Sequence, residues 1–295
     1  MNINTLKKPI LKDYINLAIL SAVWGTAFIG IEIAIQQLDV FQVTFGRVVI
    51  AFLFLLPFVL YKGLVLPKDS KTWFLLSISA ILNTTIPFSL INHGQEYITS
   101  GMSALMLGFG PFITLLLGQY LTHDEKISKY KIISIVFGFT GLVLLLGDNI
   151  IASNIAQLKG QSFVLMASLS YALSSLVIRK ITGISYLSLS FLMFGISALI
   201  LTPIVFVLYS DYVFTVNNST IAILYLGILP TAIASIYRVK MVQEVGIQFM
   251  SQVAYLIPIF AMVWAWLVLD EIPKAITLVA LVIVLLGLYI RSKSD

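Results

Sequence analysis

Two acidic pairs in this chain match each other across a long interval. Asp124-Glu125 recurs as Asp270-Glu271, 146 residues later, and each pair follows a long apolar run. Carboxylates at such places can cap the free N–H groups at the start of a helix, or they can act in a gate. We favour capping for both pairs, each at the helix that follows it.

Arg47 is the one cation placed inside an apolar stretch, in the segment FGRVVIAF. A charge at such a position is costly and is by default a functional hypothesis. Its guanidinium group could hold a carboxylate of a ligand or a gate. It could also snorkel outward, or pair with Glu32, Asp39 or Glu96. We favour the ion pair, in a structural or gating role, over direct binding of a ligand.

Several aromatic and polar residues also lie within apolar stretches. Trp24 is near the middle of the first stretch, and Tyr171 occupies the matching place after an interval of about 147 residues. Trp24 could line a cavity or pack between helices, and Asn83 could line the cavity or form an interhelical hydrogen bond. The candidate binding residues are Trp24, Thr26, Arg47, Asn83, Tyr171, Ser174, Gln252 and Tyr255.

Composition limits the class of protein that carries these residues. Of 295 residues, 59% are apolar and 11% charged, against roughly 45 to 50% and 25% in a soluble domain. The chain is therefore expected to be a membrane protein. It has no cysteine, which excludes disulfides and thiolate chemistry. His93 and His123 fall at opposite membrane ends, so we expect no metal site.

The apolar runs predict ten transmembrane helices, the first of them a retained helix and not a cleaved signal peptide. No extramembrane segment is long enough to fold alone. The chain also lacks a GxxxxGK[ST] loop and any Ser-His, Asp-Asp or HExxH constellation at membrane depth, so we expect no enzyme and no cofactor. The expected spans are 14–35, 41–61, 72–91, 101–121, 130–147, 161–178, 186–209, 220–237, 248–269 and 275–290.

The cations indicate the orientation of these spans. With the N-terminus inside, inner segments hold fifteen Lys and Arg residues and outer segments hold two, Lys159 and Lys274. This bias is the positive-inside pattern, and it places both termini in the cytoplasm. The net charge of +5 is thus a signal of topology, with nucleic acid not expected as a partner.

Other residues repeat at intervals of 146 to 148 residues, close to that of the acidic pairs. Gln95-Glu96 recurs as Gln243-Glu244, and Met102-Ser103 as Met250-Ser251. Five spans per copy is an odd number, so the copies enter the membrane from opposite faces. We therefore predict an all-α polytopic protein of two inverted five-helix repeats, 1–147 and 161–295, joined by an external linker at 148–160. Inverted repeats are typical of secondary transporters.

Pro111 and Pro258 stand at corresponding places in the two copies. Paired interruptions of this kind point to a transport site, although a packing kink is the alternative. Glu32 and Glu96 are expected near the external end, where they could act in gating. No carboxylate falls in the middle of a span, which favours transport without proton coupling.

The chain resembles the EamA-type transporters of the drug/metabolite transporter superfamily. The resemblance rests on Trp24-Gly25 in the first span, Arg47 in the second, QEYITSG before the fourth, and Glu125 and Glu271 closing the fourth and ninth. It implies that spans one to four and six to nine surround a central cavity, with spans five and ten peripheral. The second copy departs from the pattern, since Tyr171-Ala172 replaces Trp-Gly and Met193 or Phe194 replaces the arginine.

The resemblance implies a bacterial inner-membrane exporter of small metabolites such as amino acids, working by alternating access. We expect uncoupled facilitated transport. The alternatives are a proton-coupled drug or metabolite antiporter and a structural membrane protein. The expected partners are a small-molecule solute and the lipid bilayer, and the sequence does not choose between a monomer and a homodimer.

Overall fold

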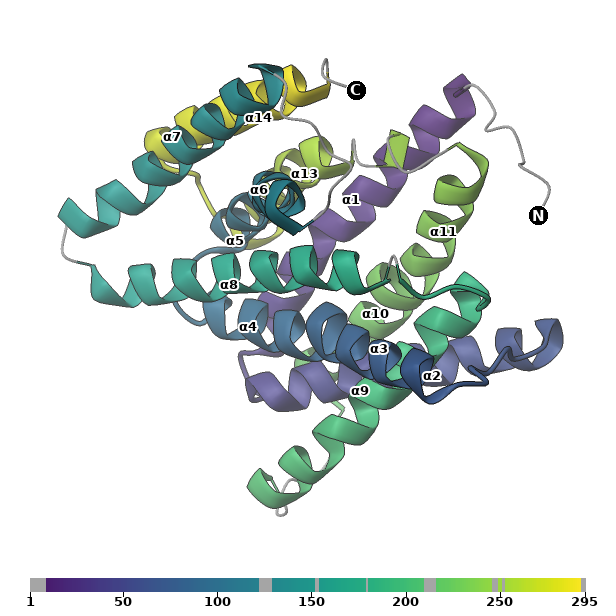
Figure 1. The fold of residues 1–295 in the computed structure, drawn as a ribbon. Helices are drawn as coiled ribbons and strands as arrows, with labels where there is room; N and C mark the ends of the chain where they lie inside the picture. The colour runs from purple at the N-terminus through teal and green to yellow at the C-terminus, as the bar shows by residue number, and fades with distance from the viewer. Residues whose placement is uncertain are drawn as a thin grey trace.

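The computed structural model describes residues 9–121, 129–151, 154–178, 180–209, 216–245, 249–250 and 253–292. Within these ranges every regular element is helical (Figure 1). The elements are α1 (Leu11–Ala34), α2 (Val40–Lys62), α3 (Ser70–Ala80), η1 (Ile81–Thr85), α4 (Ile86–Gln95), α5 (Ser100–Leu107), α6 (Gly110–Leu121), α7 (Lys129–Ile151), α8 (Ile155–Ile178), α9 (Tyr186–Leu208), α10 (Asn218–Leu226), η2 (Gly227–Ile233), α11 (Ala234–Glu244), α13 (Val253–Leu269) and α14 (Ala275–Ser292). The segments η1 and η2 are π-helices.

The helices agree with the expected membrane class. Seven are long and apolar enough to cross a bilayer, and they include the composite helices Ser70–Gln95 and Asn218–Arg238. Three shorter apolar helices, at Ser100–Ile113, Leu256–Leu269 and Ala275–Ile290, coincide with the three remaining expected spans. Large apolar side chains such as Tyr61 and Val207 are exposed on the outer surface. Such exposure is expected of a surface that contacts lipid.

Polar side chains set the starts of several helices. Asp39 accepts a hydrogen bond from the backbone N–H of Phe41 at 3.0 Å and opens α2. Asp69 accepts from the side chain and the backbone of Thr72 at the start of α3. These bonds hold the pKa of the exposed Asp69 carboxyl below its usual range. Each residue supplies an acceptor for the N–H groups that a helix start leaves unpaired.

The connection between the two halves is shorter than the linker expected at 148–160. Helix α7 continues to Ile151, and α8 begins at Ile155. Asn154 accepts from the backbone N–H of Gln157 at 3.2 Å, which is the bond of an N-cap residue. The residues after Asn154 include several polar ones, and for that reason the sequence predicts a loop there. Polarity alone does not distinguish a loop from the capped end of a helix.

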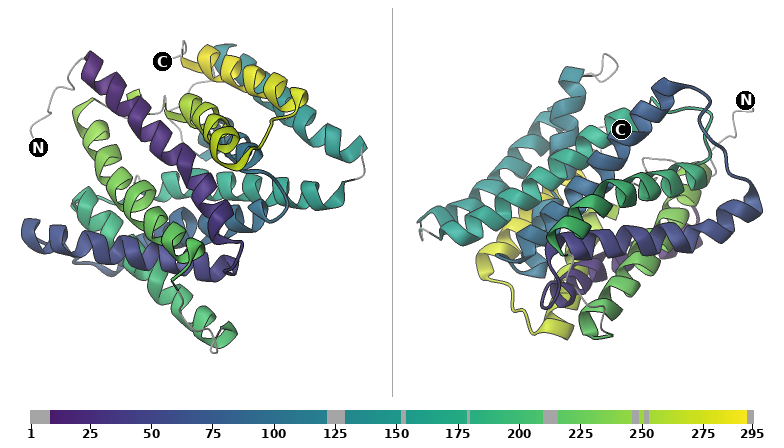
Figure 2. Two further views of the ribbon diagram at one scale, coloured as in Figure 1. Left: turned by 180° about the vertical axis from the view of Figure 1, so that it is seen from behind. Right: turned by 90° about the horizontal axis from the view of Figure 1, so that it is seen from below.

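The helices α7 and α14 lie side by side at the edge of the molecule, as both Figure 1 and Figure 2 show. A Cβ at Gly138 of α7 or at Gly287 of α14 would meet the ring of Phe112 from α6 within 3.1 Å. These small residues let the two helices approach α6 closely. The fifth and tenth expected spans are therefore peripheral.

Helices of both halves pack around α1. One buried cluster joins α1 to α2, α4, α5, α8, α10 and α13 through residues that include Phe28, Ile31, Ile91, Ala167 and Leu226. Gly25 of α1 lies so close to α13 that a Cβ there would be 2.9 Å from the backbone nitrogen of Ala261. The first helix of the first half is thus embedded in helices of the second half.

Candidate functional site

The two π-helical segments occupy equivalent positions in the inverted halves. η1 begins at Ile81 and η2 at Gly227, an interval of 146 residues, which is the interval of the acidic pairs. π-helical turns are rare and occur frequently at functional sites. A proline lies within or just after each segment, Pro230 in η2 and Pro87 behind η1.

Segment η2 holds the side chain of Arg47. The Arg47 Nε–H donates to Thr231 Oγ1 at 2.7 Å, and the Thr231 hydroxyl donates to the Leu226 carbonyl at 2.7 Å. The guanidinium carbon lies 3.9 Å from the centroid of the Phe88 ring. Arg47 is only 6% exposed. The arginine is therefore fixed by one hydrogen bond and one cation–π contact.

The backbones of α2 and η2 approach each other closely at Gly227. A Cβ on Gly227 would lie 2.5 Å from Ile50 Cγ2 and 3.1 Å from the Arg47 carbonyl oxygen. No side chain fits at this position without movement of one helix. The glycine therefore determines how near Thr231 comes to Arg47.

The first helix of each half contacts the π segment of the other half. Trp24 of α1 donates from Nε1 to the Pro230 carbonyl of η2 at 2.9 Å. Ser170 of α8 donates to the Leu82 carbonyl of η1 at 2.7 Å. Ser170 directly precedes Tyr171, the residue matched to Trp24. The two contacts are related by the inverted repeat, and each uses a backbone carbonyl of a π segment.

Asn83 and Thr26 lie beside these contacts. Asn83 is half-buried in η1, and within the described part of the chain its amide has no hydrogen-bond partner. Thr26 donates to the Val23 carbonyl at 2.6 Å and forms a short hydrogen bond with the Tyr225 hydroxyl. The Asn83 amide can therefore bind a ligand without losing a hydrogen bond, whereas the Thr26 hydroxyl already forms two.

Tyr171 packs against the cluster of apolar residues that includes Phe88, the ring on which Arg47 lies. Ile236 of α11 packs against the same cluster, which also contains Val48. Arg238 is an exposed residue of α11. The sequence places Arg238 with the cytoplasmic cations. Its position near the end of an apolar helix is the only signal in the sequence that sets it apart.

The other expected binding residues are placed as follows. Ser174 is fully buried in α8, and no described residue accepts or donates a hydrogen bond to its hydroxyl. Gln252 lies outside the described residues, and Tyr255 is in α13 with its side chain outside them. The structure therefore brings together Trp24, Arg47 and Tyr171, with Asn83 on the adjacent π segment.

The two prolines expected to interrupt matching helices differ from each other. Near Pro111 the helix is broken, since α5 ends at Leu107 and α6 begins at Gly110. Helix α13 continues through Pro258 without a break, a difference from the expected pair of interruptions. A Cβ at Gly108 would be 3.4 Å from the Pro258 ring. Neighbouring helices that pack this closely allow a proline within a membrane helix.

The repeated acid Glu271 caps a helix of the other half. Its carboxylate accepts from the backbone N–H groups of Ser100 at 3.1 Å and Gly101 at 3.3 Å, at the start of α5. The expectation that it caps the helix following it, α14, is wrong. Capping itself is observed, but the free N–H groups belong to a segment about 170 residues earlier. Asp124 and Glu125 lie outside the described residues.

Glu32 lies in α1 beside this cap. Gln95 donates to the Phe28 carbonyl at 2.8 Å and to Glu32 Oε2 at 3.3 Å. Gln95 also donates to Ser100 Oγ at 3.2 Å, and the backbone N–H of Ser100 donates to Glu271. Neither carboxylate is in an ion pair with Arg47 in the described part of the chain. The ion pairs expected for Arg47 are thus replaced by contacts with Thr231 and Phe88.

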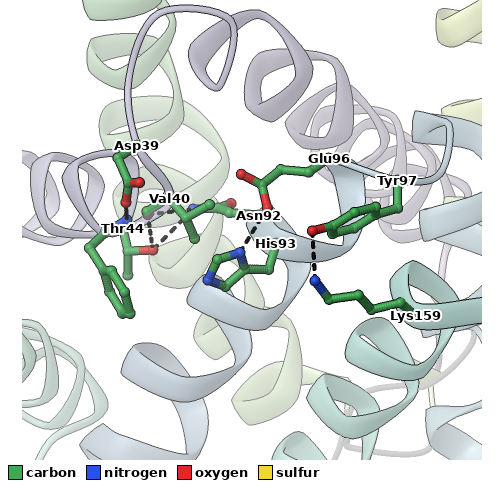
Figure 3. Close-up of polar contacts among 9 residues, drawn as sticks. Asp39, Val40, Thr44, Asn92, His93, Glu96, Tyr97 and Lys159 are labelled. Atoms are coloured by element: carbon green, nitrogen blue, oxygen red, sulfur yellow. Dashed lines mark hydrogen bonds and ion pairs between the residues drawn. The ribbon is translucent and has the colours of Figure 1, made fainter. Parts of the chain in front are cut away.

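Figure 3 shows the polar contacts near Glu96. Glu96 is exposed and accepts from His93 Nδ1 at 2.8 Å. The buried Asn92 joins α4 to α2 by donating to the Val40 carbonyl at 3.3 Å and to Thr44 Oγ1 at 3.0 Å (Figure 3). Lys159 donates to the Tyr97 hydroxyl at 2.8 Å. No cluster of three metal-binding side chains occurs among the residues that the structure describes.

Comparisons with known proteins agree with this architecture. The profile described as the EamA-like transporter family matches two stretches, residues 13–147 and 158–292. An "Uncharacterized transporter" of Archaeoglobus fulgidus is 24% identical over 286 residues, which are 95% of this chain and 97% of that protein. The Bacillus subtilis "Uncharacterized transporter YdfC" is 24% identical and covers 96% of this chain and 91% of that protein.

A plant protein and a solved structure extend the comparison. A chloroplastic WAT1-related protein of Arabidopsis thaliana is 24% identical over 276 residues, 90% of this chain, and the chain spans 66% of its length. A crystal structure with 14% sequence identity and a TM-score of 0.67 covers 94% of this chain and 96% of its own. The latter shows that the fold is shared.

Proposed function

Because the chain belongs to the EamA-like transporter family, we propose that it exports small metabolites such as amino acids by alternating access, without a coupling ion. It is a multi-pass membrane protein of a transporter family. The proposed location is a bacterial inner membrane, with both termini in the cytoplasm, as the distribution of Lys and Arg favours. No catalytic step is part of this proposal.

One observation carries the proposal. The π segments η1 and η2 stand at inverted-equivalent positions, and each receives a hydrogen bond from the first helix of the other half, through Ser170 and Trp24. Irregular backbone at membrane depth is tolerated where it is packed in protein or lines a water-filled path. Two such segments, related by the repeat, suit a site that is exposed alternately to either side.

The proposed solute site uses Trp24, Asn83, Tyr171 and Arg47. Their side chains come from α1, η1, α8 and α2, so both halves contribute. The buried Ser174, together with Gln252 and Tyr255, is proposed as a further lining residue. Replacement of Trp24, Asn83 or Tyr171 by alanine should lower the flux of a labelled amino acid in a counterflow assay with proteoliposomes. The amount of transporter per proteoliposome is kept equal to that of the wild type. Normal flux in all three variants would place the site elsewhere.

The proton-coupled alternative is supported by a specific contact. Glu32 accepts from the Gln95 amide at 3.3 Å, and Gln95 and Glu271 both form hydrogen bonds with Ser100, so two carboxylates share one polar network. A carboxylate that binds and releases a proton during the cycle is the usual carrier in coupled exporters. Accumulation of solute driven by a pH gradient, at zero membrane potential, and lost in Glu32→Gln would establish this alternative over uncoupled transport.

A further inference from the structure

A groove lies on the outer surface of the molecule, bounded by α2, α9 and α10. Its volume is about 600 Å³, which is within the range of cavities that hold small molecules. Helix α2 packs against both α9 and α10, and the last turns of α9 project from the body of the molecule (Figure 1). The groove therefore has α2 at its base, with α9 and α10 on its two sides.

Buried residues close the inner side of the groove. Leu38 and Ile223 line it and belong to the buried cluster around α1, against which Ile50 also packs. Ile223 lies so close to α2 that a Cβ at Gly46 would be 2.8 Å from its Cγ2. The groove is thus closed toward the protein core.

The outer rim of the groove is apolar and exposed. Phe206 of α9 is 70% exposed, and Ile221 and Leu224 of α10 are exposed as well. These residues belong to two helices that are long and apolar enough to cross a bilayer, so the rim is continuous with the surface that contacts lipid. None of the described residues that line the groove carries a charge. The groove therefore suits a hydrocarbon chain.

The polar residues of the lining lie at the end of the groove where α2 and α10 begin. Gln42 accepts from the backbone N–H of Asp39 at 2.9 Å, and Thr220 accepts from the backbone N–H of Asn217 at 2.9 Å. Both bonds belong to capping boxes at helix starts. Tyr209, the third polar residue of the lining, directly follows the end of α9. One end of the groove is therefore polar and the remainder apolar.

The length of the groove is close to the thickness of one leaflet. The lining residues of α2 run from Gln42 to Ile50, which is a rise of about 12 Å in an α-helix. Half of a hydrocarbon core of about 30 Å is about 15 Å thick. An acyl chain that enters at the polar end can therefore lie along the groove within a single leaflet.

We propose that this groove binds one phospholipid, with an acyl chain against Phe45, Val49 and Val205 and the head group beside Gln42 and Thr220. The chain then packs on Ile50, whose Cγ2 would be 2.5 Å from a Cβ at Gly227 of η2. The bound lipid thereby supports the close contact between α2 and η2. This inference concerns a lipid site and does not depend on the proposed transport.

The test counts bound lipid and measures its effect on stability. Purified protein in a mild detergent is stripped of lipid and titrated with dioleoylphosphatidylethanolamine. Native mass spectrometry and thermal unfolding are then recorded. We expect one lipid to bind more tightly than any further one, and the melting temperature to rise as it binds. Glycerophosphoethanolamine, which has the same head group without acyl chains, should neither bind nor stabilise.

Two valines of α9 provide a matched pair of variants. Val205 lines the groove, whereas Val207 is exposed on the same helix and lies outside the lining. Val205→Trp fills the groove and should weaken binding of the first lipid about tenfold or more, the effect of losing about two buried methylene groups. Val207→Trp adds the same ring outside the groove and should leave the affinity unchanged. Val49→Phe fills the groove from α2 and should act like Val205→Trp.

The outcomes decide for or against the lipid site. Equal affinity for the first lipid in the wild type, Val205→Trp and Val49→Phe would overturn the inference, as would equal losses in Val205→Trp and Val207→Trp. Stabilisation by glycerophosphoethanolamine to the same extent as by the full lipid would also contradict it. If Val205→Trp does not fold, Val49→Phe decides by the same comparison. Counterflow is not a readout of this test, so a failure of the transport proposal leaves its result intact.

Discussion

The segments η1 and η2 share a position in the repeat and a backbone conformation, but their side chains differ in hydrogen bonding. In η2 the Thr231 hydroxyl donates to Leu226 and accepts from Arg47. In η1 the hydroxyls of Thr84 and Thr85 are buried, and neither has a partner in the described part of the chain. The inverted repeat has preserved the π-helical turn while the chemistry of the two turns has diverged.

This difference assigns different roles to the two segments. Segment η2 is held in place by hydrogen bonds with Arg47 and Trp24 and by the close contact at Gly227, so it is the more rigid of the two segments. η1 offers Asn83 and is joined to α8 by the Ser170 bond. Under the proposed function, η1 is the segment whose hydrogen bonds change during the transport cycle, because its buried hydroxyls have no partner in the described part of the chain.

The largest expected effect is at the close contact between η2 and α2. Gly227→Val should destabilise the protein by about 3 kcal/mol, because the added atoms collide with Ile50 and with the Arg47 carbonyl. The free energy of unfolding in mixed micelles measures this. Gly147→Ala is the control, since a Cβ there meets nothing within 4 Å. A cost equal to that of the control would show that η2 is not held rigidly.

The next effect compares equivalent threonines in the two segments. Thr231→Val should cost about 2 kcal/mol, because it leaves the buried Arg47 Nε–H without its acceptor. Thr85→Val removes a buried hydroxyl that has no described partner, and it should be neutral or slightly stabilising. The same unfolding measurement applies to both variants. Equal losses at the two positions would remove the contrast between the segments.

A smaller effect concerns the two contacts that the repeat relates. Trp24→Phe and Ser170→Ala each delete one hydrogen bond to a π-segment carbonyl, at 2.9 Å and 2.7 Å. Each should lower the unfolding free energy by about 1 kcal/mol. The double variant should show additive losses, because the bonds lie on different segments. Strong coupling between them would mean that η1 and η2 move as one unit.

The smallest effect on stability is expected at Asn83. Asn83→Ala should change the unfolding free energy by less than about 0.5 kcal/mol, a value typical of side chains without strong contacts. The amide has no hydrogen bond to lose within the described structure. Solute flux should nevertheless fall, since the amide is proposed to contact the solute. A large loss of stability would indicate that Asn83 serves packing.

The helical class and the positions of most spans can be predicted from the sequence, because long uncharged runs such as 48–61 are typical of transmembrane helices. The π segments cannot be, since they depend on contacts between residues far apart, such as Ser170 with Leu82. Glu271 is recognisable as a capping residue, but the predicted partner helix is wrong because the N–H groups that it caps come from the other half.

The candidate site shows the same limit. Arg47 is identified because a charge inside an apolar run is conspicuous, whereas its actual partners, Thr231 and Phe88, carry no charge and leave no mark in the sequence. Arg238 reads as a topology signal because it stands near the end of a span. In the structure its side chain is exposed on α11.

Alternating access requires that the region between η1 and η2 open to each side of the membrane in turn. The chain has no cysteine, so Asn83→Cys carries a single thiol at this region. Its labelling by a membrane-impermeant maleimide is measured in right-side-out and in inside-out vesicles, with Lys62→Cys as a control for the sidedness of the vesicles. We expect labelling of Asn83→Cys in both preparations and of Lys62→Cys in one. Labelling of Asn83→Cys from one side only, at every time point, would contradict alternating exposure of this region.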